Sequence, residues 1–430
     1  MEKEKDFIIK EIKAGENYIR KLGPGIITGA ADDDPSGIAT YSQTGAQFGT
    51  GLLWMAAWTF PLMSMIQEMC ARIALVTGQG LAANIKISYS KKVLYICTLL
   101  LFLANTLNIG ANLGAMAKAV ELINPTIPFV FLVIFIGLFS LVCEILIPYK
   151  RFAKFLKYLV MSLFAYIVTG LMINMNWSTL FIDGLIPQIE FTKTQLFLIT
   201  GILGTTISPY LFFWQTSQEV EAQIDQGKVT PESRVGTNKE EIKEMRTDVW
   251  TGMFLSNLVM FFIIAVCANT LFVNGITDIQ TAADAARALE PFAGRFATWL
   301  FALGIIGTGL LSIPVLAGSS AYALSESLGW KEGLYWKLKE ARAFYSVIAV
   351  SMIIGILINF VGIDPIKALI YSAIANGIIA PIVIICIVHI SSSDKVMGEF
   401  KNKKFTKVVG WIIAGLMSVT AIATIVAMFL

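Results

Sequence analysis

Three consecutive aspartates, Asp32 to Asp34, lie inside the first apolar stretch of this 430-residue chain. Carboxylates on a lipid-facing helix would be very costly, so these must face the protein interior or a water-filled cavity. Pro35 and Gly37 follow directly; a proline removes a helical hydrogen bond and a glycine tolerates unwinding. The stretch therefore predicts a broken membrane helix, in which free carbonyls near Ala31 and a carboxylate suit a cation. The alternative is a helix end in the headgroup region that is kinked at Pro35.

The composition is that of a membrane protein. Hydrophobic residues make up 56% of the chain and charged residues 15%, which predicts an all-α polytopic membrane protein. The net charge is only +3 and the basic residues are spread over several connections, so we expect no nucleic-acid partner. The five cysteines stand singly in apolar segments and are expected to be buried free thiols. Residues 1–22 are charged and lack a hydrophobic core, which indicates a cytoplasmic N-terminal segment and not a cleavable signal peptide.

Eleven apolar runs are long enough to cross a bilayer, which takes about 20 residues. They lie at 24–48, 52–77, 93–119, 127–147, 153–174, 195–218, 249–273, 296–323, 343–361, 366–390 and 407–429. If the N-terminus is cytoplasmic, the external connections carry few basic residues, only Lys118, Lys193, Arg287, Arg295 and Lys367. The positive-inside rule requires this asymmetry, so we expect a multi-pass cell-membrane protein with an external C-terminus. The charged connection at 219–247 is expected to be a cytoplasmic surface loop.

A second interrupted span indicates an internal repeat. The sixth span contains Thr205, Ser208, Pro209 and Tyr210, again a proline beside small and hydroxylated residues. Two proline-interrupted helices, one opening each half of a chain, point to a transporter site between inverted repeats. We therefore predict a transporter core at 23–390, with repeat one at 23–174 and repeat two at 195–390. Residues 391–430 are then a cytoplasmic linker and a peripheral eleventh helix. Alternatively, the second proline is only a kink.

Several amides lie inside the spans. Asn105, Asn108 and Asn112 share one face of the third span, where they could line a pathway or form interhelical hydrogen bonds. Asn376, on the tenth span, is either a helix-bridging amide or a residue near the ion. Glu68 and Arg72 are spaced for a structural ion pair on the second span.

These motifs resemble the Nramp (SLC11-type) divalent metal transporter superfamily. The resemblance runs from Gly23-Pro24-Gly25 through Asp34-Pro35-Ser36-Gly37 to Gly45-Ala46-Gln47-Phe48-Gly49, and resumes at Gly204 to Tyr210. It implies a LeuT-type fold with an inverted repeat of helices 1–5 and 6–10, of which helices 1 and 6 are broken. It also implies a metal-binding carboxylate at Asp34 and backbone ligands at Ala31 and Thr205.

The chain departs from the family pattern at its ligand positions. The family's asparagine ligand is replaced by Gly37 and its methionine ligand by Ser208. A thioether is a soft ligand that favours transition metals, so its loss weakens selection against Mg²⁺ and Ca²⁺. The smaller side chains also leave room for a partly hydrated ion, which suits Mg²⁺ because it dehydrates reluctantly.

The family's proton route is also altered. Its acidic pair and its histidine correspond here to Asn105, Asn108 and Tyr210, none of which titrates near neutral pH. In these replacements the chain is similar to the Nramp-related magnesium transporters. Asp32 and Asp33 are additional acids, expected to supply outer-shell or vestibule charge.

The sequence thus predicts a secondary transporter for divalent metal cations, Mg²⁺ and Mn²⁺ above all, that works by alternating access without proton coupling. The metal site is expected at Asp34, Ala31, Gly37, Thr205 and Ser208, with Asp32, Asp33, Tyr210, Asn376, Asn105 and Asn108 around it. No catalytic residue and no cofactor besides the transported ion are expected, and a monomer is compatible with these features. The rival is a cation-coupled organic-solute transporter on the same fold, which the acidic run disfavours because it would repel an anionic substrate.

Overall fold

The computed structural model describes residues 23–147, 161–190, 192–279 and 282–429. The predicted N-terminal segment 1–22 and the first part of the predicted fifth span lie outside these ranges. The described residues form helices and no strand, as the sequence predicts. The five cysteines are buried and free.

Seven helices in the described ranges are long and apolar enough to cross a membrane. They are α6 (Lys91–Ile123), α7 (Phe129–Leu146), α11 with α12 (Lys193–Asp225), α14 with its following turn (Lys239–Asn274), α17 (Ala297–Leu328), α19 (Pro365–Ser391) and α21 (Lys404–Phe429). The other predicted spans correspond to α2 with α3, α4 (Trp54–Thr77), α9 (Phe164–Met172) and α18 (Arg342–Ile358). A total of eleven spans remains a prediction.

Both predicted helix breaks are present. The first span consists of α2 (Pro24–Asp32) and α3 (Pro35–Phe48), and the sixth of α11 (Lys193–Thr206) and α12 (Pro209–Asp225). In each case a proline is the first residue of the second half, where its fixed φ suits a helix start and its missing N–H is not needed. The carbonyls four residues earlier, those of Ala31 and Thr205, therefore have no helical N–H donor.

The two broken helices are held by close helix contacts. A methyl group on Gly29 would overlap the carbonyl oxygen of Gly252, and one on Gly204 would overlap that of Ala373. Glycine at these positions lets α2 approach α14 and α11 approach α19 at backbone distance, as small residues do between membrane helices. The packing fixes both breaks inside the bundle, where α6, α17 and α19 also meet.

The prediction of a surface loop at 219–247 is largely wrong. The helix α12 continues to Asp225, the short α13 spans Pro231–Arg234, and α14 already begins at Lys239. Asn238 caps α14 by accepting hydrogen bonds from the amides of Glu240 and Glu241, which satisfies donors that a helix start leaves free. The charged residues therefore extend two membrane helices beyond the apolar region.

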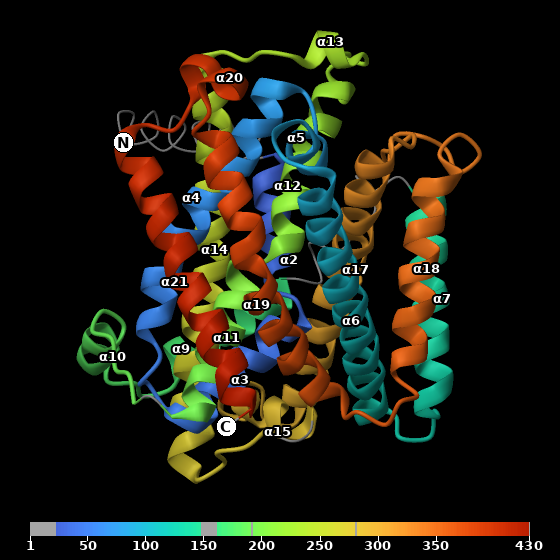
Figure 1. The fold of residues 1–430 in the computed structure, drawn as a ribbon. Coiled ribbons are helices and arrows are strands. Elements are labelled where there is room, and N and C mark those ends of the chain that lie inside the picture. Colours follow the sequence, from blue (N-terminus) through green and yellow to red (C-terminus); the bar gives the residue numbers. More distant parts are fainter. Residues whose placement is uncertain (1–22, 148–160, 191, 280–281, 430) are drawn as a thin grey trace, which may run out of the picture.

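The basic connections gather at one end of the bundle. Figure 1 shows α5 (Leu81–Ser88), α13, α20 (Asp394–Met397) and the connection between α17 and α18 at the top, with α10 (Trp177–Asp183) and α15 (Ala282–Ala286) at the bottom. The top is the end that the charge pattern predicts to be cytoplasmic. We refer to it as the basic end.

Candidate functional site

Asp34 lies at the break of the first span and is fully buried. One carboxylate oxygen accepts hydrogen bonds from the Ser36 hydroxyl at 2.5 Å and the Gly37 amide at 2.9 Å. The other accepts from the side-chain amides of Asn108 at 3.1 Å and Asn112 at 3.2 Å on α6. Two donors from α3 and two from α6 thus contact the carboxylate, which caps α3 and joins it to α6. Such hydrogen bonds from neutral donors stabilise a buried anion.

The two carbonyls freed by the prolines have hydroxyl partners. The Tyr210 hydroxyl donates to the Ala31 carbonyl at 3.4 Å, and the Ser208 hydroxyl lies within hydrogen-bond distance of the Gly204 and Thr205 carbonyls, at 2.5 and 2.7 Å. The Thr205 hydroxyl in turn donates to that of Tyr41, on α3, at 3.1 Å. These contacts bring the breaks of the first and sixth spans together. Since the Tyr210 bond is long, the Ala31 carbonyl is only weakly satisfied.

Gly37 takes part through its backbone. Its amide binds Asp34, and a methyl group at this position would lie 3.2 Å from the Tyr41 ring and 3.4 Å from the Asp32 carbonyl oxygen. The position therefore has no oxygen ligand to offer from a side chain. It has little room for a larger residue unless Tyr41 moves.

The three asparagines of α6 divide into two roles. Asn105 donates to the Leu316 carbonyl and to two serine hydroxyls of α17, so its described contacts are interhelical and none is to Asp34. Asn108 and Asn112 reach Asp34, and Asn112 was not among the predicted site residues. The spacing of Asn108 and Asn112 at i and i+4 was the signal that could have identified it. The side-chain oxygen of Asn112 accepts no hydrogen bond from a described residue.

Asn376 lies one helical turn beyond Ser372 on α19, and the Ser372 hydroxyl donates to the side-chain oxygen of Asn108. The Asn376 side chain is 1% exposed, and neither of its polar atoms has a hydrogen-bond partner among the described residues. An amide with no partner in a buried position is rare, because leaving it unpaired is costly. A bound ion or its water would satisfy it.

Asp32 and Asp33 face a different helix. Both are buried, and both accept hydrogen bonds from the Ser256 hydroxyl on α14, at 2.5 Å and 3.3 Å. This burial does not fit the expectation that Asp32 and Asp33 supply charge to a vestibule, because a vestibule is open to water. Ser256 was missed by the sequence analysis, because nothing in a lone serine marks it as the partner of residues more than 200 positions away.

The site is built from oxygen and amide groups. No three His, Cys, Asp or Glu side chains gather into a metal-binding group anywhere in the described ranges. The single histidine, His389, contacts the Tyr89 hydroxyl beside α5, at the basic end. One carboxylate with neutral oxygens is a donor set that suits hard cations.

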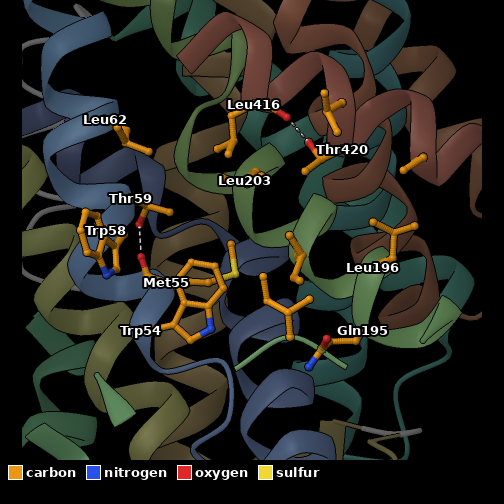
Figure 2. A pocket seen from close by; sticks show the side chains of 14 residues that line it. Trp54, Met55, Trp58, Thr59, Leu62, Gln195, Leu196, Leu203, Leu416 and Thr420 are labelled. Carbon is orange, nitrogen blue, oxygen red and sulfur yellow. Dashed lines mark hydrogen bonds between the residues drawn. The ribbon is translucent and has the colours of Figure 1, made fainter. Parts of the chain in front are cut away.

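A cavity of about 360 Å³ lies elsewhere in the bundle. Figure 2 shows it between α4, α11 and α21, where Trp54, Trp58 and Leu196 line it. Its walls are mostly apolar, and none of the predicted site residues borders it. It therefore does not compete with Asp34 as a cation site.

The family model and the relatives that are similar in sequence point to one family. The family model described as natural resistance-associated macrophage protein-like (Nramp) matches residues 25–427. A divalent metal cation transporter MntH of Klebsiella pneumoniae (strain 342) is 24% identical over 406 residues, which cover 92% of this chain and 91% of that protein. The MntH of Caldanaerobacter subterraneus subsp. tengcongensis is 25% identical over 420 residues, which cover 94% and 92%.

Solved structures show the same fold. A crystal structure of the Eremococcus coleocola manganese transporter, in complex with an aromatic bis-isothiourea substituted compound, matches with a TM-score of 0.74 at 18% identity, over 94% of this chain and 86% of that one. The inward-facing structure of Mhp1 matches with a TM-score of 0.54 at 14% identity, over 94% and 90%. The predicted LeuT-type fold is thereby confirmed.

Proposed function

Because the chain belongs to the Nramp family, we propose that it is a secondary transporter that carries divalent metal cations across the membrane by alternating access, with Mg²⁺ and Mn²⁺ as its main ions. The observation that carries this proposal is the position of Asp34. This buried carboxylate lies where the breaks of two membrane helices meet, and at each break a carbonyl, that of Ala31 or Thr205, has no helical donor. The similar proteins are named divalent metal cation and manganese transporters.

One break lies near the start of each half of the chain, and we assign the two halves to inverted repeats at 23–174 and 195–390. Residues 391–430 then form a linker and a peripheral helix. In such a fold the two broken helices supply ligands to an ion from both repeats, and the ion is exposed to one side of the membrane at a time.

In the ion-bound state, Asp34 supplies the negative charge and the Ala31 and Thr205 carbonyls supply backbone oxygens. The ion displaces the Tyr210 hydroxyl from Ala31 and the Ser208 hydroxyl from Thr205. The free side-chain oxygen of Asn112 and the unpartnered amide of Asn376 are then available to the ion directly or through its retained water.

The proposed preference for hard ions follows from the donor atoms. Neither Ser208 nor Gly37 provides sulfur, so an incoming ion meets oxygen and amide groups, and the short Ser208 side chain lets it keep part of its water. Mg²⁺ tolerates such a site because it loses water reluctantly, whereas softer metals gain nothing from it. Mn²⁺ is hard enough to share these ligands.

We propose that transport is not coupled to protons. The four groups that donate to Asp34 are a hydroxyl, a backbone amide and two side-chain amides, and none of these titrates near neutral pH. Tyr210, at the position of the family's histidine, has a hydroxyl that is also neutral there.

Release of the ion at the basic end requires α2 to separate from its neighbours. The Asp248 carboxylate on α14 accepts hydrogen bonds from the backbone amides of Gly23, Gly25 and Ile26 at 2.8, 2.6 and 3.2 Å. A carboxylate at a helix N-terminus satisfies the free amides and the helix dipole. These bonds hold the amino end of α2 closed against α14, and opening on this side breaks them.

The rival function, a cation-coupled transporter of organic solutes on the same fold, lacks a specific observation in its favour. The described surroundings of Asp34 contain no Lys or Arg side chain bonded to it, so an anionic substrate group would meet Asp34 without a counter-charge.

Uptake into proteoliposomes tests the proposal. Mg²⁺, Mn²⁺, Ca²⁺ and Zn²⁺ would be compared with and without a pH gradient, in wild-type protein and in the Asp34→Asn variant. We expect uptake of Mg²⁺ and Mn²⁺ that needs Asp34 and no gradient. Equal uptake by the variant would overturn the site, and strict dependence on the gradient would overturn the absence of coupling.

A further inference from the structure

A groove of about 570 Å³ lies at the basic end of the molecule, between α4, α14 and the start of α21. It is separate from Asp34 and plays no part in the proposed transport. Six cationic side chains line it against two acidic ones, Glu68 and Glu399; the cationic residues are Arg72, Lys239, Lys243, Arg246, Lys401 and Lys403. A concave surface with this excess of positive charge fits an anion.

Arg72 is the buried cation of the groove. Its side chain is 7% exposed, and its Nε has no hydrogen-bond partner among the described residues. Another guanidinium nitrogen donates to the side-chain oxygen of Asn402. Arg72 therefore places a guanidinium charge, neutralised only in part, in the inner wall of the groove.

The nearest acid neutralises this charge only in part. One oxygen of Glu68 accepts from Arg246 at 2.8 Å and the other from the Trp250 indole at 3.0 Å, while the Arg72 guanidinium lies 3.9 Å away. The predicted Glu68–Arg72 ion pair is therefore present, but Glu68 is bonded mainly to α14. The negative charge of Glu68 is thus shared between Arg246 and Arg72, and the groove still carries more positive than negative side chains.

The other wall of the groove is apolar. Trp250 and Phe400 line it, and Phe405, also in the lining, is 75% exposed in the first turn of the membrane-spanning α21. Positive charge and exposed aromatic surface thus meet where a helix enters the membrane. A free inorganic anion would use only the charged part, whereas a phospholipid has a phosphate for the cations and acyl chains for the aromatic side.

We propose that this groove binds one anionic phospholipid, with its phosphate at Arg72 and between Lys243 and Lys403, and its chains along Phe405. Basic pockets between membrane helices on the cytoplasmic side recognise such headgroups. The lipid joins the start of α21 to α4 and α14. The inference rests on the proposed membrane topology and not on the proposed ion selectivity.

Thermal unfolding of the purified, delipidated full chain in detergent tests the proposal without any metal ion. Phosphatidylglycerol, phosphatidylcholine and inorganic phosphate would be added separately, and native mass spectrometry would count the bound lipid. We expect phosphatidylglycerol to raise the unfolding midpoint more than phosphatidylcholine does, with one lipid retained per chain, and inorganic phosphate to have little effect.

Two paired variants locate the effect. In Lys243→Glu with Lys403→Glu, two exposed cations of the groove are reversed; in Lys337→Glu with Lys339→Glu, two exposed lysines of the α17–α18 connection at the same end are reversed instead. The preference for phosphatidylglycerol should vanish in the first pair and persist in the second. Equal stabilisation by both lipids, an equal effect of inorganic phosphate, or equal loss in both variants would each overturn the proposal. Since no ion is present, these outcomes are independent of the uptake experiment.

Discussion

The Asp34→Asn substitution keeps the shape of the side chain and removes its charge. Asp34 is the only carboxylate that the four donors around it contact, and the remaining proposed ligands are neutral. Removing one partner of a buried, hydrogen-bonded charge pair costs about 2–5 kcal/mol of binding. Because no second carboxylate replaces the first, we expect the upper part of that range, about 3–5 kcal/mol, or about 150- to 5,000-fold in the dissociation constant.

The variant should still fold. An asparagine oxygen can accept from Ser36 and Gly37 as the carboxylate does, so the cap of α3 is kept. Its amide group then faces the amide donors of Asn108 and Asn112, and those two hydrogen bonds are lost. Removing a buried charge offsets part of this loss, since the desolvation of the ionised group no longer opposes folding. A change in binding can therefore be separated from a change in stability.

The assay is Mn²⁺ binding by calorimetry together with Mn²⁺ uptake into proteoliposomes, on monodisperse protein. Asp33→Asn is the matched control, because Asp33 is also buried but contacts Ser256 instead of the Asp34 network. We expect the control to lose far less affinity than Asp34→Asn. Normal uptake by Asp34→Asn would refute the assignment, and an equal loss in the control would mean that the ion depends on the total negative charge near the break and not on Asp34 in particular.

Three further predictions concern the same site. Asn112→Ala should weaken Mg²⁺ binding about tenfold, as the loss of one hydrogen bond to a charged group implies. Asn105→Ala should change Mg²⁺ affinity much less. Calorimetry on both variants checks this order, and a larger loss in Asn105→Ala would make Asn105 the site residue. Ser208→Met with Gly37→Asn should lower the ratio of Mg²⁺ to Cd²⁺ affinity, because sulfur suits the softer ion and the bulk displaces retained water; an unchanged ratio in folded protein would place selectivity elsewhere. Metal uptake should not acidify the vesicle lumen, and a metal-dependent signal from a trapped pH dye, absent from empty liposomes, would show that another group carries protons.

The local features of the site could be predicted from the sequence. A proline four residues after Ala31, and another four residues after Thr205, remove the helical donors by covalent structure alone. The acidic run and the proline then place Asp34 at a helix break without any knowledge of its neighbours. These predictions needed only the order of residues within one span.

The partners from other helices could not be predicted in the same way. Asn105 and Asn112 lie on one face of α6 and both donate to α17, yet only Asn112 also reaches Asp34, because a helix of 33 residues passes several neighbours along its length. Likewise, Ser256 gains its role only when α14 packs against α2. The extension of α12 and α14 into the charged connection was missed because charged residues form helices as readily as loops once a cap such as Asn238 starts them.

The hydrogen bonds around Asp34 also bear on how the proposed transporter returns after releasing its ion. A carboxylate left without partners inside the membrane would need a proton or a second cation before the empty carrier could move. Here four neutral donors contact Asp34, and hydroxyl groups contact the Ala31 and Thr205 carbonyls. In the proposed uncoupled cycle, these contacts stabilise the carboxylate after the ion has left, so that the return step needs no co-transported proton. In this view Asn108, which stands where the family has an acidic residue, serves the uncoupled cycle, since its amide cannot carry a proton and instead donates to Asp34.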